Sequence, residues 1–180
     1  MTESNKDFIK RSAAKNNKKN PGGTDSNDLF SRKKKVTLDT NVILSGLMFD
    51  SKTCMDAIEK STTDDQMMMT NIIYAECLQQ TKKQNSPKTE AELKEQMRQH
   101  LPDPTHIDLP PDTELKKMYT IRDDKDLKIL YSAEATRSEV LVTGDKDFYE
   151  SNFKGPKNVK ILKPHDYLES KPTRRRSFRK

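Results

Sequence analysis

The chain has 180 residues, of which 31% are hydrophobic and 34% are charged, and its formal net charge is +6. This length suffices for one domain with an ordinary core, and the low hydrophobic content predicts that part of the chain stays outside that core. No stretch approaches the roughly 18 apolar residues of a membrane helix, and the N-terminus has no signal-peptide pattern, so we expect a soluble, cytoplasmic protein with no membrane partner.

The charge is distributed unevenly along the chain. Residues 1–35 hold ten Lys and Arg against four Asp and Glu, and residues 171–180 hold six basic residues and no acidic one. Each segment is therefore +6, and because the whole chain is also +6, residues 36–170 carry −6. We predict a disordered basic tail at 1–34, one acidic domain at 35–170 and a disordered basic tail at 171–180.

Two basic clusters accompany these tails and are the predicted nucleic-acid-binding residues. They are Arg32, Lys33, Lys34 and Lys35 at the start of the domain, and Arg174, Arg175 and Arg176 near the C-terminus. Such clusters attract a phosphate backbone regardless of its sequence. The alternative for either cluster is a solvated run of charge that only aids solubility.

The first half of the domain predicts a strand, a turn and several helices. Residues 36–44 (VTLDTNVIL) indicate a buried strand that ends at Asp39 and turns at Thr40 and Asn41 into a helix or tight loop. A short helix follows Ser51, residues 61–65 form a loop, and residues 67–69 form a short strand. Thr70 or Asn71 then caps a helix, and an amphipathic surface helix spans 87–100.

The second half continues the same alternation. We predict an extended segment at 106–109, a short helix after Asp112 and a clear helix after Asp126. Strands at 140–143 and 159–162 follow, and a helical turn at 165–169 closes the domain. Because strands and helices alternate, the pattern predicts an α/β fold with a mostly parallel sheet covered by helices.

Four isolated carboxylates occupy comparable settings in these elements. Asp39 and Asp145 follow strand ends, where ligands bind in α/β sheets, while Glu76 and Asp126 lie beside core positions of helices. Each has a structural alternative. Asp39 is also a candidate helix cap, Glu76 a surface residue, Asp126 the capping-box partner of Asp123, and Asp145 an Asx-turn residue.

The chemistry of such a cluster points to a cation. Carboxylates that converge without basic partners repel one another, so at neutral pH the cluster needs bound cations or bound protons. Ligand sets made only of oxygen select hard divalent ions such as Mg²⁺ or Mn²⁺. These ions activate water and stabilise the charge on a phosphodiester during its hydrolysis.

Several motifs together resemble the PIN domain family. They are LDTNVILSG, NIIYAECL, DLKILYSAEATRSEVLVTGDKDFYE and VKILKPHDYL, and they cover about residues 36–168. The combination of L-D-T-N with V-T-G-D-K-D-F in this order is specific, whereas either piece alone is weak. The resemblance is greatest to the branch of toxin components of toxin–antitoxin systems.

The resemblance implies a Rossmann-like three-layer α/β/α fold and a Mg²⁺- or Mn²⁺-dependent ribonuclease. The family's acidic constellation maps onto four residues, which are therefore the predicted catalytic and metal-binding residues: Asp39, Glu76, Asp126 and Asp145. The resemblance also matches Asn41 and Thr143 to polar positions that orient these carboxylates, and Asp147 to an accessory metal-binding acid. Asp123 and Asp124 compete with Asp126 for the third position.

Our hypothesis is a metal-dependent endoribonuclease whose partners are RNA, a neutralising antitoxin protein implied by the family, and a second copy of the chain. Two alternatives stay open. One is a PIN-like module that binds RNA or protein without cutting, and the other is a structure-specific DNA nuclease. The full set of four acids argues against the first, and nothing in the sequence separates RNA from DNA.

Overall fold

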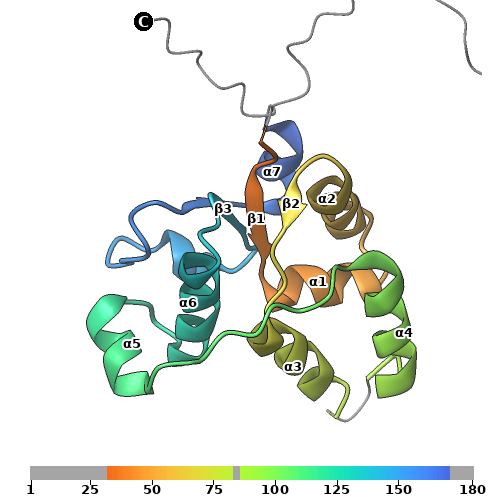
Figure 1. Ribbon diagram of the computed structural model, residues 1–180, viewed down its shortest axis with the longest axis horizontal. Coiled ribbons are helices and arrows are strands. Elements are labelled where there is room, and N and C mark those ends of the chain that lie inside the picture. The colour runs from red at the N-terminus through yellow and green to blue at the C-terminus, as the bar shows by residue number, and fades with distance from the viewer. Residues whose placement is uncertain (1–31, 83–85, 171–180) are drawn as a thin grey trace, which may run out of the picture. The chain divides into compact units, whose positions relative to one another are not determined.

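The structure is a computed structural model that describes residues 32–82 and 86–170 (Figure 1). The predicted tails lie almost entirely outside this range, and so do Arg174, Arg175 and Arg176. Of the basic clusters, Arg32 to Lys35 can therefore be placed. Within the described residues, no helix is both long enough and apolar enough to span a bilayer.

A four-stranded parallel sheet forms the centre of the domain. Its strands are β1 (Lys35–Leu38), β2 (Gln66–Met67), β3 (Val140–Val142) and β4 (Lys160–Leu162). Their order is β2-β1-β3-β4, and all three neighbouring pairs are parallel. The predicted parallel sheet is therefore confirmed.

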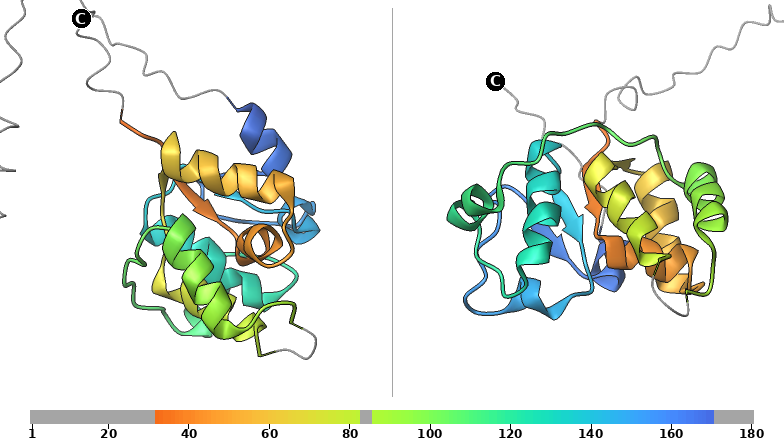
Figure 2. Two further views of the ribbon diagram at one scale, coloured as in Figure 1. Left: turned by 90° about the vertical axis from the view of Figure 1, so that its right-hand side faces the viewer. Right: turned by 90° about the horizontal axis from the view of Figure 1, so that it is seen from below.

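Within the described residues, seven helices and two 3₁₀ turns accompany these strands. The helices are α1 (Thr40–Leu47), α2 (Lys52–Thr63), α3 (Asn71–Gln80), α4 (Glu90–His100), α5 (Asp112–Met118), α6 (Leu127–Ala135) and α7 (Pro164–Glu169). The 3₁₀ turns are η2 (Asp124–Asp126) and η3 (Lys146–Tyr149). Helices α2 and α7 lie on one side of the sheet, and α3 and α6 lie on the other (Figure 2). This is the predicted three-layer α/β/α arrangement.

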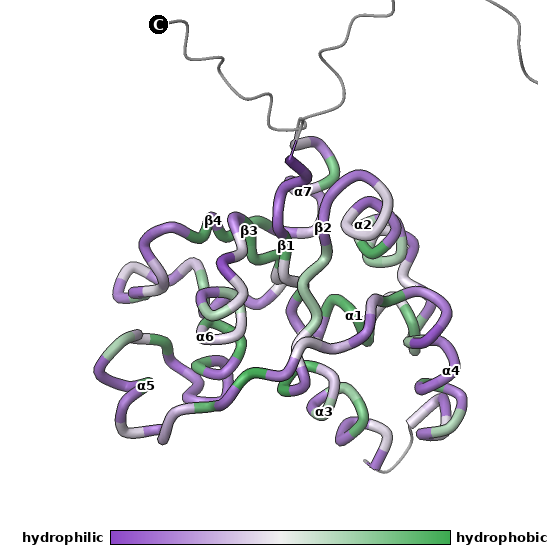
Figure 3. Tube along the Cα trace, in the orientation of Figure 1, coloured by the Kyte–Doolittle hydropathy of each residue, from purple (hydrophilic) through white to green (hydrophobic). Residues whose placement is uncertain are grey.

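The central strands are buried on both faces, as the strands of a parallel sheet usually are. Val36 and Leu38 of β1 and all of β3 are inaccessible or nearly so, and they pack with apolar residues of the covering helices. Figure 3 shows hydrophobic residues along β3 and β4 and mostly hydrophilic residues along α4. Leu93 and Met97 are the buried residues of α4, which is the amphipathic surface helix predicted from the sequence.

Helix α2 is longer than predicted. Residues 61–63 continue it instead of forming a loop, because their hydroxyl groups bond back to carbonyls one turn earlier. Ser61 Oγ donates to the Ile58 carbonyl at 2.8 Å, and Thr63 Oγ1 donates to the Glu59 carbonyl at 2.9 Å. Such local bonds let Ser and Thr complete the last turn of a helix.

The strand order places a topological switch point between β1 and β3. The chain leaves β1 for β2 on one side, and it returns to β3 on the other side. In open α/β sheets, ligands bind beyond the carboxyl ends of the strands at such a point. Asp39 follows β1 there, and the backbone N–H of Asp39 donates to the Val142 carbonyl of β3 at 2.9 Å. The two strand ends are thus tied together where the predicted acids begin.

Candidate metal-dependent active site

Asp39 is the most deeply buried acid at the switch point, with 2% of its surface exposed. It caps α1, since its Oδ1 accepts a hydrogen bond from the Asn41 backbone N–H at 3.3 Å. Its Oδ2 accepts a bond of 2.6 Å from the Thr143 hydroxyl. Asp39 is therefore a helix cap, as the structural alternative predicted. The cap bond uses only one carboxylate oxygen, and the other oxygen is bound to Thr143, which follows β3.

Asp145 is joined to Asp39 through Thr143. The Thr143 hydroxyl donates to Asp39 and accepts from the Asp145 backbone N–H at 3.1 Å. Asp145 Oδ1 accepts in turn from the Asp147 backbone N–H at 2.9 Å, which is the Asx turn that opens η3. Both acids that follow strand ends therefore use one oxygen to fix the local backbone. Thr143, which the family resemblance matches to an orienting position, thus donates its side-chain hydrogen bond to Asp39.

Glu76 reaches the same region from α3. Its Oε2 accepts a hydrogen bond of 2.9 Å from the Thr40 hydroxyl, and Thr40 directly follows Asp39. The family resemblance matches Asn41 to a second orienting position. The structure shows that Asn41 is exposed and contacts Asp39 through its backbone, while the buried hydroxyl of Thr40 binds Glu76.

Asp126 differs from Asp123 and Asp124 in the partners of its carboxyl group. Asp123 caps η2 by accepting from the Lys125 N–H at 3.0 Å, and Asp124 pairs with Lys116 at 2.5 Å. Asp126 is half-buried and makes no side-chain cap bond to α6, so the predicted capping box is not formed. The charges of Asp39 and Asp145 both act on the Asp126 carboxyl group, which supports Asp126 as the third acid.

None of the four predicted catalytic acids makes a salt bridge within the described residues, although the charge of Arg122 lies close enough to Asp145 to interact with it. Burial raises the pKa of Asp39 to about 6, and the charges of Glu76 and Asp145 add to this rise against the hydrogen bonds from Thr143 and Asn41. Burial also raises the pKa of Asp126 to about 7, helped by the charges of Asp39 and Asp145. When no cation compensates the charge, Asp126 is therefore partly protonated near neutral pH, and Asp39 takes up a proton as the pH falls toward 6.

The ligand types fit a hard divalent cation, because every group in the cluster supplies carboxylate oxygen. A coordination shell is nevertheless not preformed: within residues 32–82 and 86–170, no three His, Cys, Asp or Glu side chains stand together as a metal site requires. The acids therefore match such an ion in charge and in ligand chemistry.

Asp147, the predicted accessory acid, already has a basic partner. Arg122 Nε donates to Asp147 Oδ2 at 3.0 Å, and Arg122 Nη2 lies 2.6 Å from Oδ1. The Asp147 side chain is 3% exposed, whereas that of Arg122 is 70% exposed. Sequence reasoning did not single out Arg122, although it directly precedes the three competing acids at 123–126.

The basic cluster at the start of β1 lies at the opposite end of this strand from Asp39. Lys34 is buried, pairs with Asp65 at 3.8 Å and lies over the Tyr167 ring. Lys35 donates to the Thr136 carbonyl at 3.4 Å, and Arg32 pairs with Glu139 at 3.6 Å. Lys33 donates to the Thr63 carbonyl. Each of these side chains thus has a partner in the domain, and the buried Lys34 is poorly placed to contact a nucleic acid.

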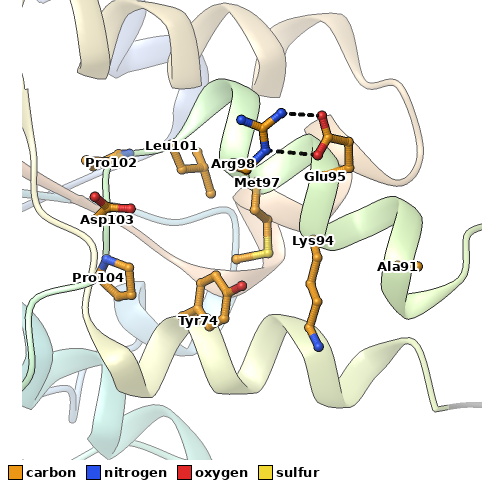
Figure 4. A pocket seen from close by; sticks show the side chains of 10 residues that line it. All are labelled: Tyr74, Ala91, Lys94, Glu95, Met97, Arg98, Leu101, Pro102, Asp103 and Pro104. Carbon is orange, nitrogen blue, oxygen red and sulfur yellow. Dashed lines mark hydrogen bonds and ion pairs between the residues drawn. The ribbon is translucent and has the colours of Figure 1, made fainter.

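Two hollows lie near the elements that carry the acids. One, of about 410 Å³, opens beside the cluster between α1 and η3, and it is lined by Asn41, Cys54, Asp145 and Lys146. The other, of about 580 Å³, lies between α3 and α4 and is lined by Tyr74, Met97 and Leu101 (Figure 4). The larger hollow contains none of the four predicted catalytic acids, so the smaller one is the candidate substrate cleft.

Comparison with known proteins gives a family and a fold. The profile of the PIN domain family matches residues 35–147, which is more than half of the chain. No curated protein sequence matches. A chain in the crystal structure of VapBC2 from Rickettsia felis, bound to a DNA fragment from their promoter, is similar with a TM-score of 0.52 and 17% identity. The similarity covers 72% of this chain and 98% of that chain, and at this identity it supports the fold alone.

Proposed function

The chain belongs to the PIN domain family, and on that premise we propose that it is a metal-dependent endoribonuclease that hydrolyses RNA phosphodiester bonds. The observation that carries the proposal is the group of acids at the switch point of the sheet, none of which makes a salt bridge within the described residues. Burial and mutual repulsion raise the pKa of Asp39 and of Asp126 there. Such perturbed groups gathered at a sheet's ligand-binding end are typical of functional sites.

In this proposal, Asp39, Glu76, Asp126 and Asp145 hold one or two Mg²⁺ or Mn²⁺ ions. The ion supplies water activation and stabilises the charge that develops on the phosphate. The protein's own hydroxyl groups orient the ligands: Thr143 holds Asp39, and Thr40 holds Glu76. Outer contacts of this kind fix the direction of a metal-binding carboxylate.

The hollow beside Asp145 gives the RNA a place to lie. It is lined by Asn41 and Lys146 as well as by Asp145, so a strand in it would meet an amide and an ammonium group next to the acids. Lys146 is exposed, and its charge suits a phosphate that flanks the bond to be cut. We assign the scissile phosphate to the end of this hollow nearest Asp145.

A toxin of a toxin–antitoxin pair is the biological role that we propose for this activity. The support is the sequence resemblance to that branch of the family and the fold shared with VapBC2 of Rickettsia felis. A toxic ribonuclease should arrest growth of a bacterial host when it is expressed, and the Asp39→Asn variant should not. Equal growth arrest by both proteins would contradict this role.

The basic tails should strengthen RNA binding without taking part in the chemistry. The segment 171–180 carries six basic residues and no acid, so its removal should weaken RNA binding and flatten its dependence on salt. The turnover rate at saturating RNA should stay unchanged. A truncated protein with the full affinity and the full salt dependence would exclude this contribution.

The direct test is cleavage of a labelled single-stranded RNA and of a DNA of the same sequence. Each is incubated with Mn²⁺, Mg²⁺ or EDTA, and the wild type is compared with Asp39→Asn and with Asp108→Asn. Asp108 is an exposed acid outside the cluster and serves as the matched control. We expect RNA cleavage that needs a metal, is lost in Asp39→Asn and persists in Asp108→Asn. RNA binding without cleavage would instead favour a non-catalytic module, and preferential DNA cleavage would favour a DNA nuclease.

A further inference from the structure

The ion pair between Arg122 and Asp147 joins the two segments that carry Asp126 and Asp145. Arg122 lies four residues before Asp126, and Asp147 lies two residues after Asp145. The guanidinium group contacts both oxygens of the carboxylate, at 3.0 Å from Nε to Oδ2 and 2.6 Å from Nη2 to Oδ1. A second contact, Arg122 Nη1 to Glu150 Oε1 at 3.5 Å, extends the connection beyond η3.

The backbone of Asp147 continues this connection into the acidic cluster. Its N–H donates to Asp145 Oδ1, the Asp145 N–H donates to the Thr143 hydroxyl, and that hydroxyl donates to Asp39. One unbroken series of contacts thus leads from the exposed Arg122 to the most buried acid. A shift of Arg122 should therefore change the positions of the Asp145 and Asp39 carboxylates.

Asp147 is a poor candidate for a metal ligand in this arrangement. It is almost fully buried, and both of its oxygens face a guanidinium group that cannot lose its charge under ordinary conditions. Within the described residues, Oδ1 makes no well-directed hydrogen bond, so its attraction to Arg122 is ionic. A cation at Asp147 would have to displace Arg122 first.

We infer that Arg122 and Asp147 form a positioning clamp, which sets the spacing of Asp126 and Asp145 and so the affinity of the site for its cation. This inference rests on the proposed function for the identity of the ligand, but the clamp itself is a property of the metal-free protein. It reassigns Asp147 from an accessory ligand to the counter-charge that holds Arg122. Both residues are positioning residues, since neither needs to touch the substrate.

The two possible roles of Asp147 predict opposite changes in Mn²⁺ affinity for the Arg122→Gln variant. If Asp147 is a ligand that Arg122 restrains, Arg122→Gln should release it and tighten Mn²⁺ binding. If the pair is a clamp, then Arg122→Gln, Asp147→Asn and the double variant should each weaken Mn²⁺ binding by a similar factor. Loss of an outer contact to a metal ligand typically costs about 10- to 100-fold in affinity, and we expect about tenfold here.

Thermal unfolding of the metal-free protein tests the clamp without any metal. Arg122→Gln leaves the buried Asp147 charge unpaired, so the melting temperature should fall by about 5 °C or more. Asp147→Asn leaves unpaired only the exposed guanidinium group of Arg122, so it should lower the melting temperature less. The double variant should melt no lower than Arg122→Gln alone, because Asp147→Asn removes the buried carboxylate charge that Arg122→Gln leaves unpaired. Effects that simply add would contradict the clamp.

The experiment therefore combines Mn²⁺ calorimetry, thermal unfolding and hydrogen exchange on the full-length chain and its variants. Faster exchange at 122–127 and 144–149 is expected in all three clamp variants. Arg122→Lys should recover stability more than Mn²⁺ affinity, since an ammonium restores the charge but not the two-point contact. Arg98→Gln is the matched control, because Arg98 makes a similar two-point contact to Glu95 on the distant α4 and is similarly exposed.

The outcomes separate this inference from the proposed function. Wild-type protein that binds no Mn²⁺ would contradict the proposed function, while non-additive melting and faster exchange would still support the clamp. Tighter Mn²⁺ binding in Arg122→Gln would overturn the clamp and support Asp147 as a ligand. Unchanged exchange and affinity in all variants would also overturn it.

Discussion

The two ends of strand β1 both bury charged side chains, and they differ in how those charges are compensated. At the amino end, Lys34 and Asp65 are both buried and lie 3.8 Å apart. Asp65 also accepts a 2.6 Å hydrogen bond from the Tyr167 hydroxyl, and burial, together with this bond, raises the pKa of Tyr167. Each charge at this end therefore has a partner of opposite sign or a strong donor.

At the carboxyl end, the corresponding partners are hydroxyl and backbone N–H groups. Asp39 accepts from Thr143 and Asn41, and Glu76 accepts from Thr40, but neither makes a salt bridge within the described residues. The charged neighbours that raise the pKa of Asp126 are all acids. Burial without compensation costs free energy, and that cost is concentrated at the ligand-binding end of the sheet.

The contrast distinguishes charges that serve the fold from charges that serve a ligand. A buried pair such as Lys34 and Asp65 is complete within the protein, so its loss should change stability and leave function alone. In the proposed function the acids beyond β1 and β3 bind a cation, so their loss should remove that function and relieve repulsion. Substitutions at the two ends of one short strand should therefore have opposite effects.

The largest effect is expected for Asp39→Asn. Because loss of an outer contact already costs about 10- to 100-fold in metal affinity or activity, loss of a ligand should reduce cleavage by more than a hundredfold. The uncharged amide can still accept the cap bond from Asn41, so the metal-free variant should be more stable than the wild type, by up to about 3 kcal/mol at pH 7.5. RNA cleavage and urea unfolding of the same samples measure both. An Asp39→Asn variant that is both active and less stable than the wild type would contradict the proposed difference between the two ends of β1.

Thr143→Val should have an intermediate effect. The valine keeps the shape of the side chain but cannot donate to Asp39 or accept from Asp145, so both carboxylates lose their mutual orientation. We expect about a tenfold loss of Mn²⁺ affinity. Calorimetric titration measures this loss, and Thr63→Val on the exposed face of α2 is the control, since this change also removes a hydroxyl hydrogen bond. An unchanged affinity in Thr143→Val would show that the hydroxyl does not position the site.

The stability of the metal-free protein should fall as the pH rises. The pKa of Asp39 is raised from 3.8 to about 6 and that of Asp126 to about 7. The folded protein therefore binds more protons than the unfolded chain between about pH 4 and pH 7, and stability declines through this window. The contribution of Asp39 should be about 3 kcal/mol, and that of the half-exposed Asp126 should be smaller. Urea unfolding at pH 4 and pH 8 measures the change, and a stability that rises over this window because of these two groups would contradict the raised pKa values.

The smallest effect on the site is expected for Lys34→Met at the amino end. Removal of the ammonium leaves Asp65 buried with only the Tyr167 hydroxyl, which should lower the free energy of unfolding by about 3 kcal/mol. Mn²⁺ affinity, measured at a temperature where the variant is folded, should equal that of the wild type. A large loss of affinity would show that the two ends of β1 are coupled.

The sequence predicts those parts of the site that follow from local pattern. Apolar runs that end in a carboxylate locate Asp39 and Asp145 beyond β1 and β3, and helical spacing from Ile129 and Leu130 turns Asp126 inward. The parallel sheet follows in the same way from the alternation of strands and helices. These features depend on neighbours in the chain, so the sequence displays them directly.

Contacts between distant segments could not be predicted in this way. The Thr40–Glu76 bond spans 36 positions and the Arg122–Asp147 pair spans 25, and both depend on side-chain directions that only the packed fold defines. The run from Arg32 to Lys35 predicts an exposed basic patch, yet Lys34 is buried because Asp65 and Tyr167 meet it there. A charged residue is rarely buried unless it is paired, and its partner is not visible in the local sequence.

Proton release on Mn²⁺ binding tests the central claim most directly. Calorimetric titrations at pH 6.5 in buffers of different ionisation enthalpy give the number of protons displaced by the metal. Because Asp126 and, in part, Asp39 hold protons near this pH, the wild type should release about one proton per ion and almost none at pH 8.5. Asp39→Asn should bind far more weakly, and Lys34→Met should behave as the wild type. Binding that releases no proton at pH 6.5, or that is equally tight in Asp39→Asn, would contradict a cation centre built from these acids.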